Sequence, residues 1–431
     1  MRISLPYHDR TLMINLPGRN DVEVVGDRFP TPLSDVTNAL HGAVHRSVNS
    51  LPLRDLLPVK GRICILISDL TRGGGLKEIL DQLLAYLGTL GVGTDRVDIL
   101  LAMGMHRGHT KKELESHLGR QIVSRWNIFE HDATNDGSLI HVGTTPAGTP
   151  CMFNRRIVDS GLVIMLGSIT FHYFAGYGGA RKLILPGAAG EQSIIANHRL
   201  SLKEDPGNGL SDGCRPGNLE GNPVHEDMLA GARLLPPAAY AINYISDDRG
   251  RIVFVNAGEL DISHREACRF LWERFHIPLK RLYRAVVFSA GGFPRDINLL
   301  QSHKALRHAS YALDEGGIML AAAACSEGIG SSSYRDSFRN GREMVPDMVR
   351  EDYMLNSQTA MSTYELTGRF TVHLASMLEE TEVSLFGFSL WRGEQTEELL
   401  EAIPTGDILV IRNMPQFLPW RKNTPPPSLS A

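Results

Sequence analysis

Three side chains able to do acid, base or ligand chemistry fall within one glycine-rich stretch, residues 168–198. His172, Lys182 and His198 follow the apolar segment LVIMLGSI (162–169), which has the pattern of a buried strand. Glycines are dense between them, and glycine lets the backbone approach a ligand closely. A strand that ends in such a loop before a helix is a common ligand site in α/β proteins. We take this loop as the first candidate site.

His106 follows a second strand-like segment, VDILLAMGM (97–105). If both strands end at the same sheet edge, His106 and His172 stand on two sides of one small substrate. Histidine titrates near neutral pH and is the usual general acid or base. Two opposed bases are what inversion of a stereocentre needs. The alternative is a hydrogen-bonded loop histidine, which holds for any single one of the chain's 16 histidines taken alone.

A third apolar run, RICILISDL (62–70), ends at Asp69-Leu70-Thr71-Arg72 and three glycines. Backbone N–H groups in such a turn, together with an arginine, suit a phosphate or a carboxylate. A tight turn with a surface arginine is equally compatible with the pattern. We take Asp69, Thr71 and Arg72 as candidate cofactor-binding residues, and Arg72 also as a candidate substrate-binding residue.

Lys182 lies between the glycines and the apolar segment LILP. A partly desolvated lysine acts as a nucleophile or forms a covalent link to a cofactor, and the alternative is a lysine that neutralises a phosphate. His198 is a candidate metal ligand, but one histidine needs a cofactor to supply the other ligands. Gln301 and Lys304 share a predicted helix face and suit a carboxylate, unless that face is simply exposed.

The elements that must position these residues alternate between strand-like and helix-like segments along the 431 residues. We predict an α/β fold with two Rossmann-like domains and the active site in the cleft between them. Residues 1–277 form the predicted N-terminal domain with the cofactor-binding loops, and residues 278–421 form the C-terminal domain. A helical region is expected at about 334–366. The Pro/Ser-rich tail 422–431 is expected to be disordered.

Composition limits the classes of partner. The net charge of −4 and the absence of a basic segment argue against nucleic acid, and no apolar run approaches the ~20 residues of a membrane span. The five cysteines are scattered, which argues against a disulfide framework or a structural zinc site and favours a reducing cytoplasm. We expect a small-molecule substrate in a cytoplasmic protein.

Six motifs occur in one order across both halves of the chain: SDLTR (68–72), GMHRGHT (104–110), GTTPAGTPCMFNRR (143–156), FHYFAGYGGARKLILPG (171–187), NH (197–198) and GGFPRDINLLQSHKAL (291–306). In this combination the sequence resembles the nickel-dependent lactate racemase family. Each motif alone is weakly specific, and the set is specific.

The resemblance implies a cofactor and the residues that hold it. The cofactor is a nickel-pincer nucleotide, pyridinium-3-thioamide-5-thiocarboxylic acid mononucleotide, joined through a thioamide to a lysine that Lys182 matches. His198 matches the histidine ligand of the nickel. His106 and His172 match the acid/base pair.

The remaining matches concern the substrate. Arg72 and Lys304 match cations that orient it, with Asp69 and Gln301 nearby. The implied activity is a racemase or epimerase that inverts C2 of a 2-hydroxy carboxylic acid by reversible hydride transfer to the cofactor. Cofactor-synthesis proteins are implied partners, and a homodimer is a further candidate assembly.

Two departures from the family pattern concern the substrate pocket. Glycines 73–75 stand where the family has Pro and polar residues, and Leu300 stands where Tyr is frequent. They leave the particular 2-hydroxy acid open. The alternative functions are a non-catalytic nucleotide- or cofactor-binding protein of the same fold, and a hydrolase or lyase with a directly bound metal. The absence of an HExxH motif argues against the last.

Overall fold

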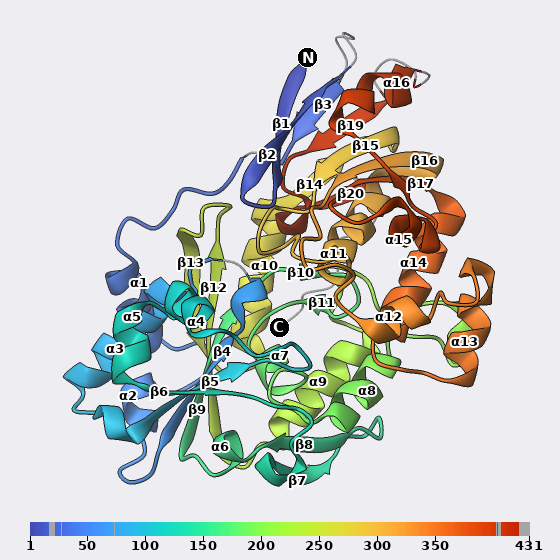
Figure 1. The fold of residues 1–431 in the computed structure, drawn as a ribbon. Coiled ribbons are helices and arrows are strands. Elements are labelled where there is room, and N and C mark those ends of the chain that lie inside the picture. Colours follow the sequence, from blue (N-terminus) through green and yellow to red (C-terminus); the bar gives the residue numbers. More distant parts are fainter. Residues whose placement is uncertain (17–21, 27, 73, 402, 404–406, 422–431) are drawn as a thin grey trace.

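The computed structural model describes residues 1–431 except 17–21, 27, 73, 402, 404–406 and 422–431. The predicted disordered tail, 422–431, therefore lies outside the described residues. Two lobes are visible in Figure 1, each built on a six-stranded sheet with helices against it. We call them the first lobe and the second lobe. The prediction of an α/β fold with two sheet-based units is confirmed.

The sheet of the first lobe has the strand order β13-β12-β9-β4-β5-β6. Its central strands pair in parallel, so that Ile65 lies beside Ile99 on one side and Ile164 on the other. Every residue of β4 and β5 is buried, which is why these strands are continuous apolar runs rather than alternating ones. The strands are β4 (Ile63–Ser68), β5 (Val97–Ala102), β6 (Asn127–Glu130), β9 (Leu162–Ser168), β12 (Ala238–Ser246) and β13 (Ile252–Gly258).

Helices cover both faces of this sheet (Figure 1). Successive side chains of a strand point to opposite faces, so Ile65 packs in the core under α1 and α3 while Leu66 packs in the core under α7, α8 and α9. The helices are α1 (Val36–His45), α2 (Leu53–Leu56), α3 (Leu76–Thr89), α4 (Lys111–Leu118), α5 (Arg120–Arg125), α6 (Arg155–Val158), α7 (Arg181–Ile184), α8 (Glu191–Arg199), α9 (Pro223–Arg233) and α10 (Ile262–Phe275).

The sheet of the second lobe has the order β18-β17-β16-β15-β19-β3, and each neighbouring pair is parallel. Its strands are β3 (Val22–Val25), β15 (Tyr283–Ser289), β16 (Leu313–Ala322), β17 (Thr371–Ala375), β18 (Ser389–Leu390) and β19 (Ile408–Ile411). Its helices are α11 (Leu299–Ala309), α12 (Ser332–Asp336), α13 (Val345–Glu351), α14 (Ser357–Arg369), α15 (Glu380–Leu385) and α16 (Thr396–Glu401).

The N-terminal segment differs from the predicted boundary. β1 (Arg2–Tyr7) and β2 (Arg10–Asn15) form a hairpin, and its apolar face packs against Val287 and Leu320 of the second lobe. Strand β3 pairs with β19, some 380 residues later in the chain. The assignment of these first strands to the N-terminal domain is thus corrected. A local pattern shows that a strand has an apolar face but not which sheet will bury it.

Three smaller ribbons complete the described structure. A hairpin is formed by β7 (Leu139–Thr144) and β8 (Pro150–Asn154). A short ribbon of β10 (Phe171–His172) and β11 (Gly176–Tyr177) follows β9, and β14 (His276–Leu279) pairs with β20 (Leu418–Arg421). No helix in the described parts of the chain is both long and apolar enough to cross a membrane.

Candidate active site

The loops after β4, β5 and β9 meet because these strands are immediate neighbours. The order β9-β4-β5 is parallel throughout, so all three strands end at the same sheet edge. Asp69, His106 and His172 follow these ends and come together, as the sequence predicted. This is where the chain reverses its direction of winding across the sheet, which is the usual ligand site of such folds.

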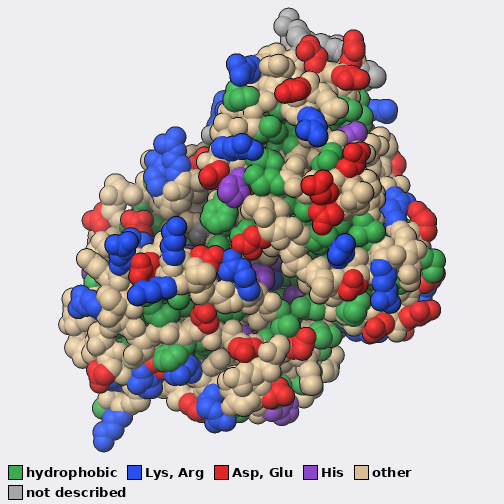
Figure 2. Space-filling view, in the orientation of Figure 1, with side chains coloured by type: hydrophobic (Ala, Val, Ile, Leu, Met, Phe, Trp, Pro, Cys, Tyr) green, Lys and Arg blue, Asp and Glu red, His purple; other side chains and the backbone are tan. Residues whose placement is uncertain are grey.

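A cavity of about 710 Å³ lies at this edge, between the two lobes. Figure 2 shows the hollow between the lobes, with histidine side chains visible in it. Most of the predicted site residues line the cavity, namely Thr71, His106, His172, Lys182, His198, Gln301 and Lys304. Asp69 lies behind His106 rather than in the lining. Arg72 ends the 3-10 turn η1 (Leu70–Arg72), and its side chain lies outside the described part of the structure.

His106 is held by a buried carboxylate. Its Nδ1 is hydrogen-bonded to Asp69 Oδ2, and the other carboxylate oxygen accepts a hydrogen bond of 2.8 Å from Thr71 Oγ1. Because an ionised carboxylate only accepts hydrogen bonds, the proton of neutral His106 is assigned to Nδ1. The Nε2 lone pair then faces the cavity, 3.4 Å from the Gln301 amide nitrogen. This is the form of histidine that removes a proton.

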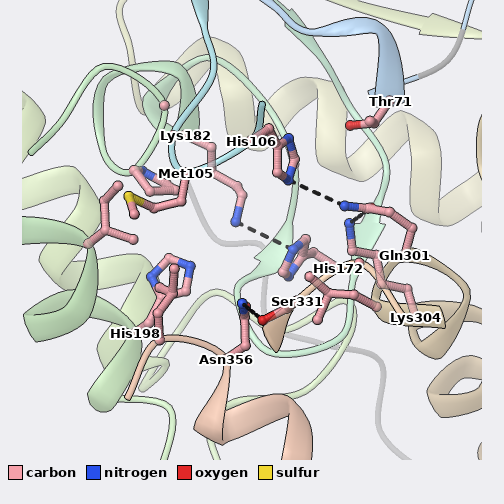
Figure 3. Close-up of a pocket in the computed structure, with 18 of the residues that line it drawn as sticks. Thr71, Met105, His106, His172, Lys182, His198, Gln301, Lys304, Ser331 and Asn356 are labelled. Atoms are coloured by element: carbon pink, nitrogen blue, oxygen red, sulfur yellow. Dashed lines mark hydrogen bonds between the residues drawn. The ribbon is translucent and has the colours of Figure 1, made fainter. Parts of the chain in front are cut away.

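His172 is held by the backbone. The Ala175 N–H donates to His172 Nδ1 at 3.3 Å, and Nε2 lies 3.5 Å from Lys182 Nζ (Figure 3). The tight turn that returns the chain requires glycine at 176, where φ is +74° and a Cβ atom would lie 1.9 Å from the Asn218 carbonyl oxygen. At this position the glycine allows the turn to pack closely on the backbone of residue 218, and the predicted close approach to a ligand stays a prediction.

A buried arginine fixes the loop that carries His172 and Lys182. Arg181 is 1% exposed and donates hydrogen bonds to the backbone carbonyls of residues 175, 177 and 178. Burial lowers its pKa to about 10, so the guanidinium stays charged at neutral pH. Its neighbour Lys182 points the other way, into the cavity.

His198 lies on α8 and faces the cavity from the same lobe (Figure 3). Burial, and then the charge of Lys182, lowers the pKa of His198 to about 3, so the ring is neutral at physiological pH. Its Nδ1 is buried and has no hydrogen-bond partner. Within the described residues, no group of three or more His, Cys, Asp or Glu side chains is arranged to hold a metal ion. A metal at His198 therefore needs ligands from another molecule.

The second lobe contributes amide and ammonium groups from α11. Asn298 caps this helix by accepting a hydrogen bond of 2.9 Å from the Gln301 N–H. Gln301 and Lys304 share a helix face as predicted, and Lys304 Nζ donates to Gln301 Oε1 at 2.5 Å. Figure 3 shows His106 and His172 between this pair and the side of the cavity that carries His198 and Lys182.

Further residues of the cavity wall were not singled out in the sequence. The predicted helical region 334–366 is broken, and the loop before α14 brings Asn356 to the cavity, where its Nδ2 donates to Ser331 Oγ at 3.1 Å. Asn356 has φ +69°, which asparagine tolerates better than most residues, but nothing in the local pattern places it at the site. Arg295 also lines the cavity and stands inside the motif GGFPRD, which is a signal that could have found it.

Comparison with protein families gives a match over both lobes. Residues 7–209 match the model of the lactate racemase N-terminal domain, and residues 282–366 match that of the lactate racemase C-terminal domain. The curated lactate racemase of Thermoanaerobacterium thermosaccharolyticum is 30% identical over 344 residues, which is 79% of this chain and 78% of the relative. That of Lactiplantibacillus plantarum is 30% identical over 334 residues, 77% of each protein.

Solved structures agree with this likeness. The lactate racemase apoprotein from T. thermosaccharolyticum superposes with a TM-score of 0.82 at 26% identity and covers 97% of this chain and 100% of its own. A protein from Thermotoga maritima, a structural genomics target, superposes with a TM-score of 0.69 over 91% of this chain and 99% of its own. At 17% identity, the second likeness concerns the fold alone.

Proposed function

The chain belongs to the lactate racemase family, and from this premise we propose that it is a racemase or epimerase that inverts C2 of a 2-hydroxy carboxylic acid. The proposed cofactor is a nickel-pincer nucleotide, with Lys182 as its covalent attachment and His198 as the protein ligand of nickel. The observation that carries the proposal is the convergence of both residues with His106 and His172 on one cavity.

The chemistry of the side chains fits such a cofactor. His198 is neutral and its ring carries a lone pair that the protein does not use, which is what a metal ligand requires. Lys182 lies on the same cavity, on the short helix α7 that Arg181 anchors, so an acyl group on its Nζ would be held in a fixed direction. When bound, a nickel-pincer nucleotide supplies an acceptor for the hydride on C2.

The chain's own residues supply the proton transfers and the orientation. His106 Nε2, held by Asp69, takes the proton of the substrate hydroxyl for one configuration. His172 is the acid/base for the other configuration, because the two imidazoles come from different strand ends of the same cavity. Since its Nδ1 accepts from the Ala175 N–H, Nε2 is the nitrogen that carries the proton in the neutral ring. Lys304 and Gln301 bind the substrate carboxylate from the second lobe, Lys304 by charge and Gln301 by its amide N–H. Arg72 is a proposed further cation for this carboxylate.

In the proposed mechanism the two histidines move only the hydroxyl proton, because the hydride on C2 is accepted by the cofactor, so no strong base is needed. A hydroxyl proton is removed only as the hydride leaves, so an imidazole of ordinary basicity is adequate. The proposed cofactor cannot assemble from the chain alone, so the proposal includes partner proteins that synthesise it.

Intact-mass analysis and metal analysis test the proposal. The protein is produced with the cofactor-synthesis proteins and, in parallel, without them, next to a Lys182→Ala variant. We expect an added mass and bound nickel only in the wild type with the synthesis proteins. Chirality is then followed for a panel of 2-hydroxy acids of both configurations, including aliphatic, aromatic, dicarboxylic and polyhydroxy members. Adduct and nickel without inversion of any member would support a cofactor carrier instead.

A further inference from the structure

Arg295 lines the active-site cavity from the loop between β15 and α11, together with Thr170 and Gln416. Burial lowers its pKa to about 10, so the guanidinium stays charged near neutral pH. No ion pair of Arg295 occurs within the described residues, and the exposed Asp248 acts on it only from a distance. The guanidinium is therefore partly buried and lies in the wall of the cavity.

The guanidinium is held in place by neutral groups. Its Nη1 donates to Asn413 Oδ1 at 3.4 Å, and Asn413 in turn donates to Gln416 Oε1 at 2.8 Å. Gly291, with φ +101°, makes room for the side chain, because a Cβ atom there would lie 2.9 Å from Arg295 Cδ. These contacts orient the guanidinium but supply no negative charge.

A buried histidine lies in the same part of the cavity wall as Arg295. His308 lines the cavity two turns after Gln301 on α11 and is almost fully buried. Burial lowers its pKa to about 4, so the ring is neutral, and a hydrogen bond with the Met414 backbone opposes this lowering only in part. Arg295 contacts Asn413, the residue before Met414. The side chains of His308 and Asn413 are therefore neutral and supply no negative charge to this part of the cavity.

A charge that is partly withdrawn from water gains from an anionic partner, and the planar guanidinium binds carboxylate and phosphate oxygens bidentately. We propose that Arg295 is the receptor for a second anionic group in the cavity, a carboxylate or a phosphate, distinct from the carboxylate at C2 that Lys304 and Gln301 bind. Its two sources are the distal carboxylate of a dicarboxylic 2-hydroxy acid and the phosphate of the nucleotide. The inference deepens the proposed function and rests on it for the choice of probes.

Calorimetric binding to the apoprotein tests this without catalysis. The substrate arm compares malate with lactate and with the malate ester that lacks the distal charge. The cofactor arm compares nicotinic acid mononucleotide with its riboside. In the arm whose anion Arg295 binds, we expect the ligand with the additional anionic group to bind about 10- to 100-fold more tightly than the ligand without it. This is the gain that charge-assisted hydrogen bonds provide. This preference should disappear in Arg295→Met.

Arg339→Met, an exposed arginine of the same lobe, is the matched control and should keep the preference. If Arg295→Met does not fold, the ligand pairs measured with the wild-type protein still test the proposal. If Arg295→Met loses a preference for the phosphate, the site belongs to the cofactor. If it loses a preference for the second carboxylate, the site belongs to the substrate. The proposal is overturned if the wild type shows neither preference or if a folded Arg295→Met keeps it. Failure of racemisation alone would remove the proposed function while an Arg295-dependent preference remained.

Discussion

The two walls of the cavity are built differently and carry different chemistry. The wall of the first lobe consists of loops at the ends of β4, β5 and β9, and it holds the imidazoles of His106 and His172 and the amine of Lys182. The wall of the second lobe is formed largely by α11 and the loops around it, and it offers ammonium, guanidinium and amide groups. The first wall suits reaction and the second suits recognition.

The difference has a physical basis in how each wall is fixed. The loops of the first lobe are locked by buried groups, such as Asp69 behind His106 and Arg181 under the Lys182 loop, so reactive atoms move little. On α11 a side chain can change without altering the backbone that carries it. Leu300, where the family frequently has Tyr, is one such position on the cavity wall. Substrate choice can therefore vary while the reaction stays the same.

A matched pair of lysine substitutions tests most directly whether the two walls of the cavity have separate roles. Lys182→Ala should abolish the mass adduct and lower racemisation at least about 1,000-fold, because the cofactor loses its attachment. Lys304→Met should keep the adduct and the nickel. Intact mass and metal content separate the two variants. Loss of the adduct in Lys304→Met would show that the second wall also holds the cofactor, and the division would fail.

The next largest effects are expected at the two histidines of the first wall. His106→Gln and His172→Gln should each lower kcat by about 10²- to 10⁴-fold, as expected for loss of a general acid or base. Both should retain the adduct, since neither is the attachment residue. Single-turnover measurements with each enantiomer check the effect. A variant that still inverts substrate at the wild-type rate would exclude that histidine from proton transfer.

Asp69→Asn tests whether the carboxylate acts through His106. The amide can donate to Nδ1 and favour the wrong tautomer, so we expect kcat to fall tenfold or more, by analogy with an oriented catalytic imidazole, with little change in KM. Asp69→Glu, which keeps the charge, should recover part of the rate. An increase in KM alone, with kcat unchanged, would instead indicate that Asp69 serves ligand binding.

Substitutions on the second wall should act mainly on affinity. Lys304→Met and Gln301→Leu are expected to raise KM by about 10- to 100-fold, because they remove charge-assisted and amide hydrogen bonds to the carboxylate. Lys280→Met, an exposed lysine of the same lobe, is the control. Steady-state kinetics at several substrate concentrations separate KM from kcat. A fall in kcat with unchanged KM would place these residues in the reaction itself.

The smallest effect concerns acid stability and a buried histidine of α11. Burial, and then Arg307, lowers the pKa of His303 to about 3, and both ring nitrogens lack partners. Unfolded histidine has a pKa of about 6.5, so below that pH the unfolded chain takes up a proton that the folded chain refuses. The free energy of unfolding therefore falls as pH drops from about 6.5 toward 3, by at most about 1.4 kcal/mol per pH unit from this group.

His303→Leu should flatten that dependence, which urea unfolding at several pH values between 7 and 4 would measure. His141→Leu, at an exposed position of β7, should leave the slope unchanged. An unchanged slope in His303→Leu would mean that the ring is not neutral in the folded protein.

Much of the fold was readable because buried parallel strands are continuous apolar runs. The segments 62–70, 97–105 and 162–169 predicted β4, β5 and β9 and the polar residues at their ends. The sequence could not show that β3 pairs with β19 or that the first hairpin joins the second lobe. Strand pairing between distant segments depends on which apolar faces remain uncovered, and no local pattern records that.

The amino-acid order alone determined the proposed reactive set, because His106, His172, Lys182 and His198 stand in motifs whose spacing around strands and glycines can be read from the sequence. Tertiary structure decided what supports them and what faces them: Asp69 behind the first imidazole, Asn356 from a break in a predicted helix, and Arg295, which forms no ion pair within the described residues. The reason is that a side chain's type is written in the sequence, whereas its burial and its partners depend on chain segments that only folding brings together.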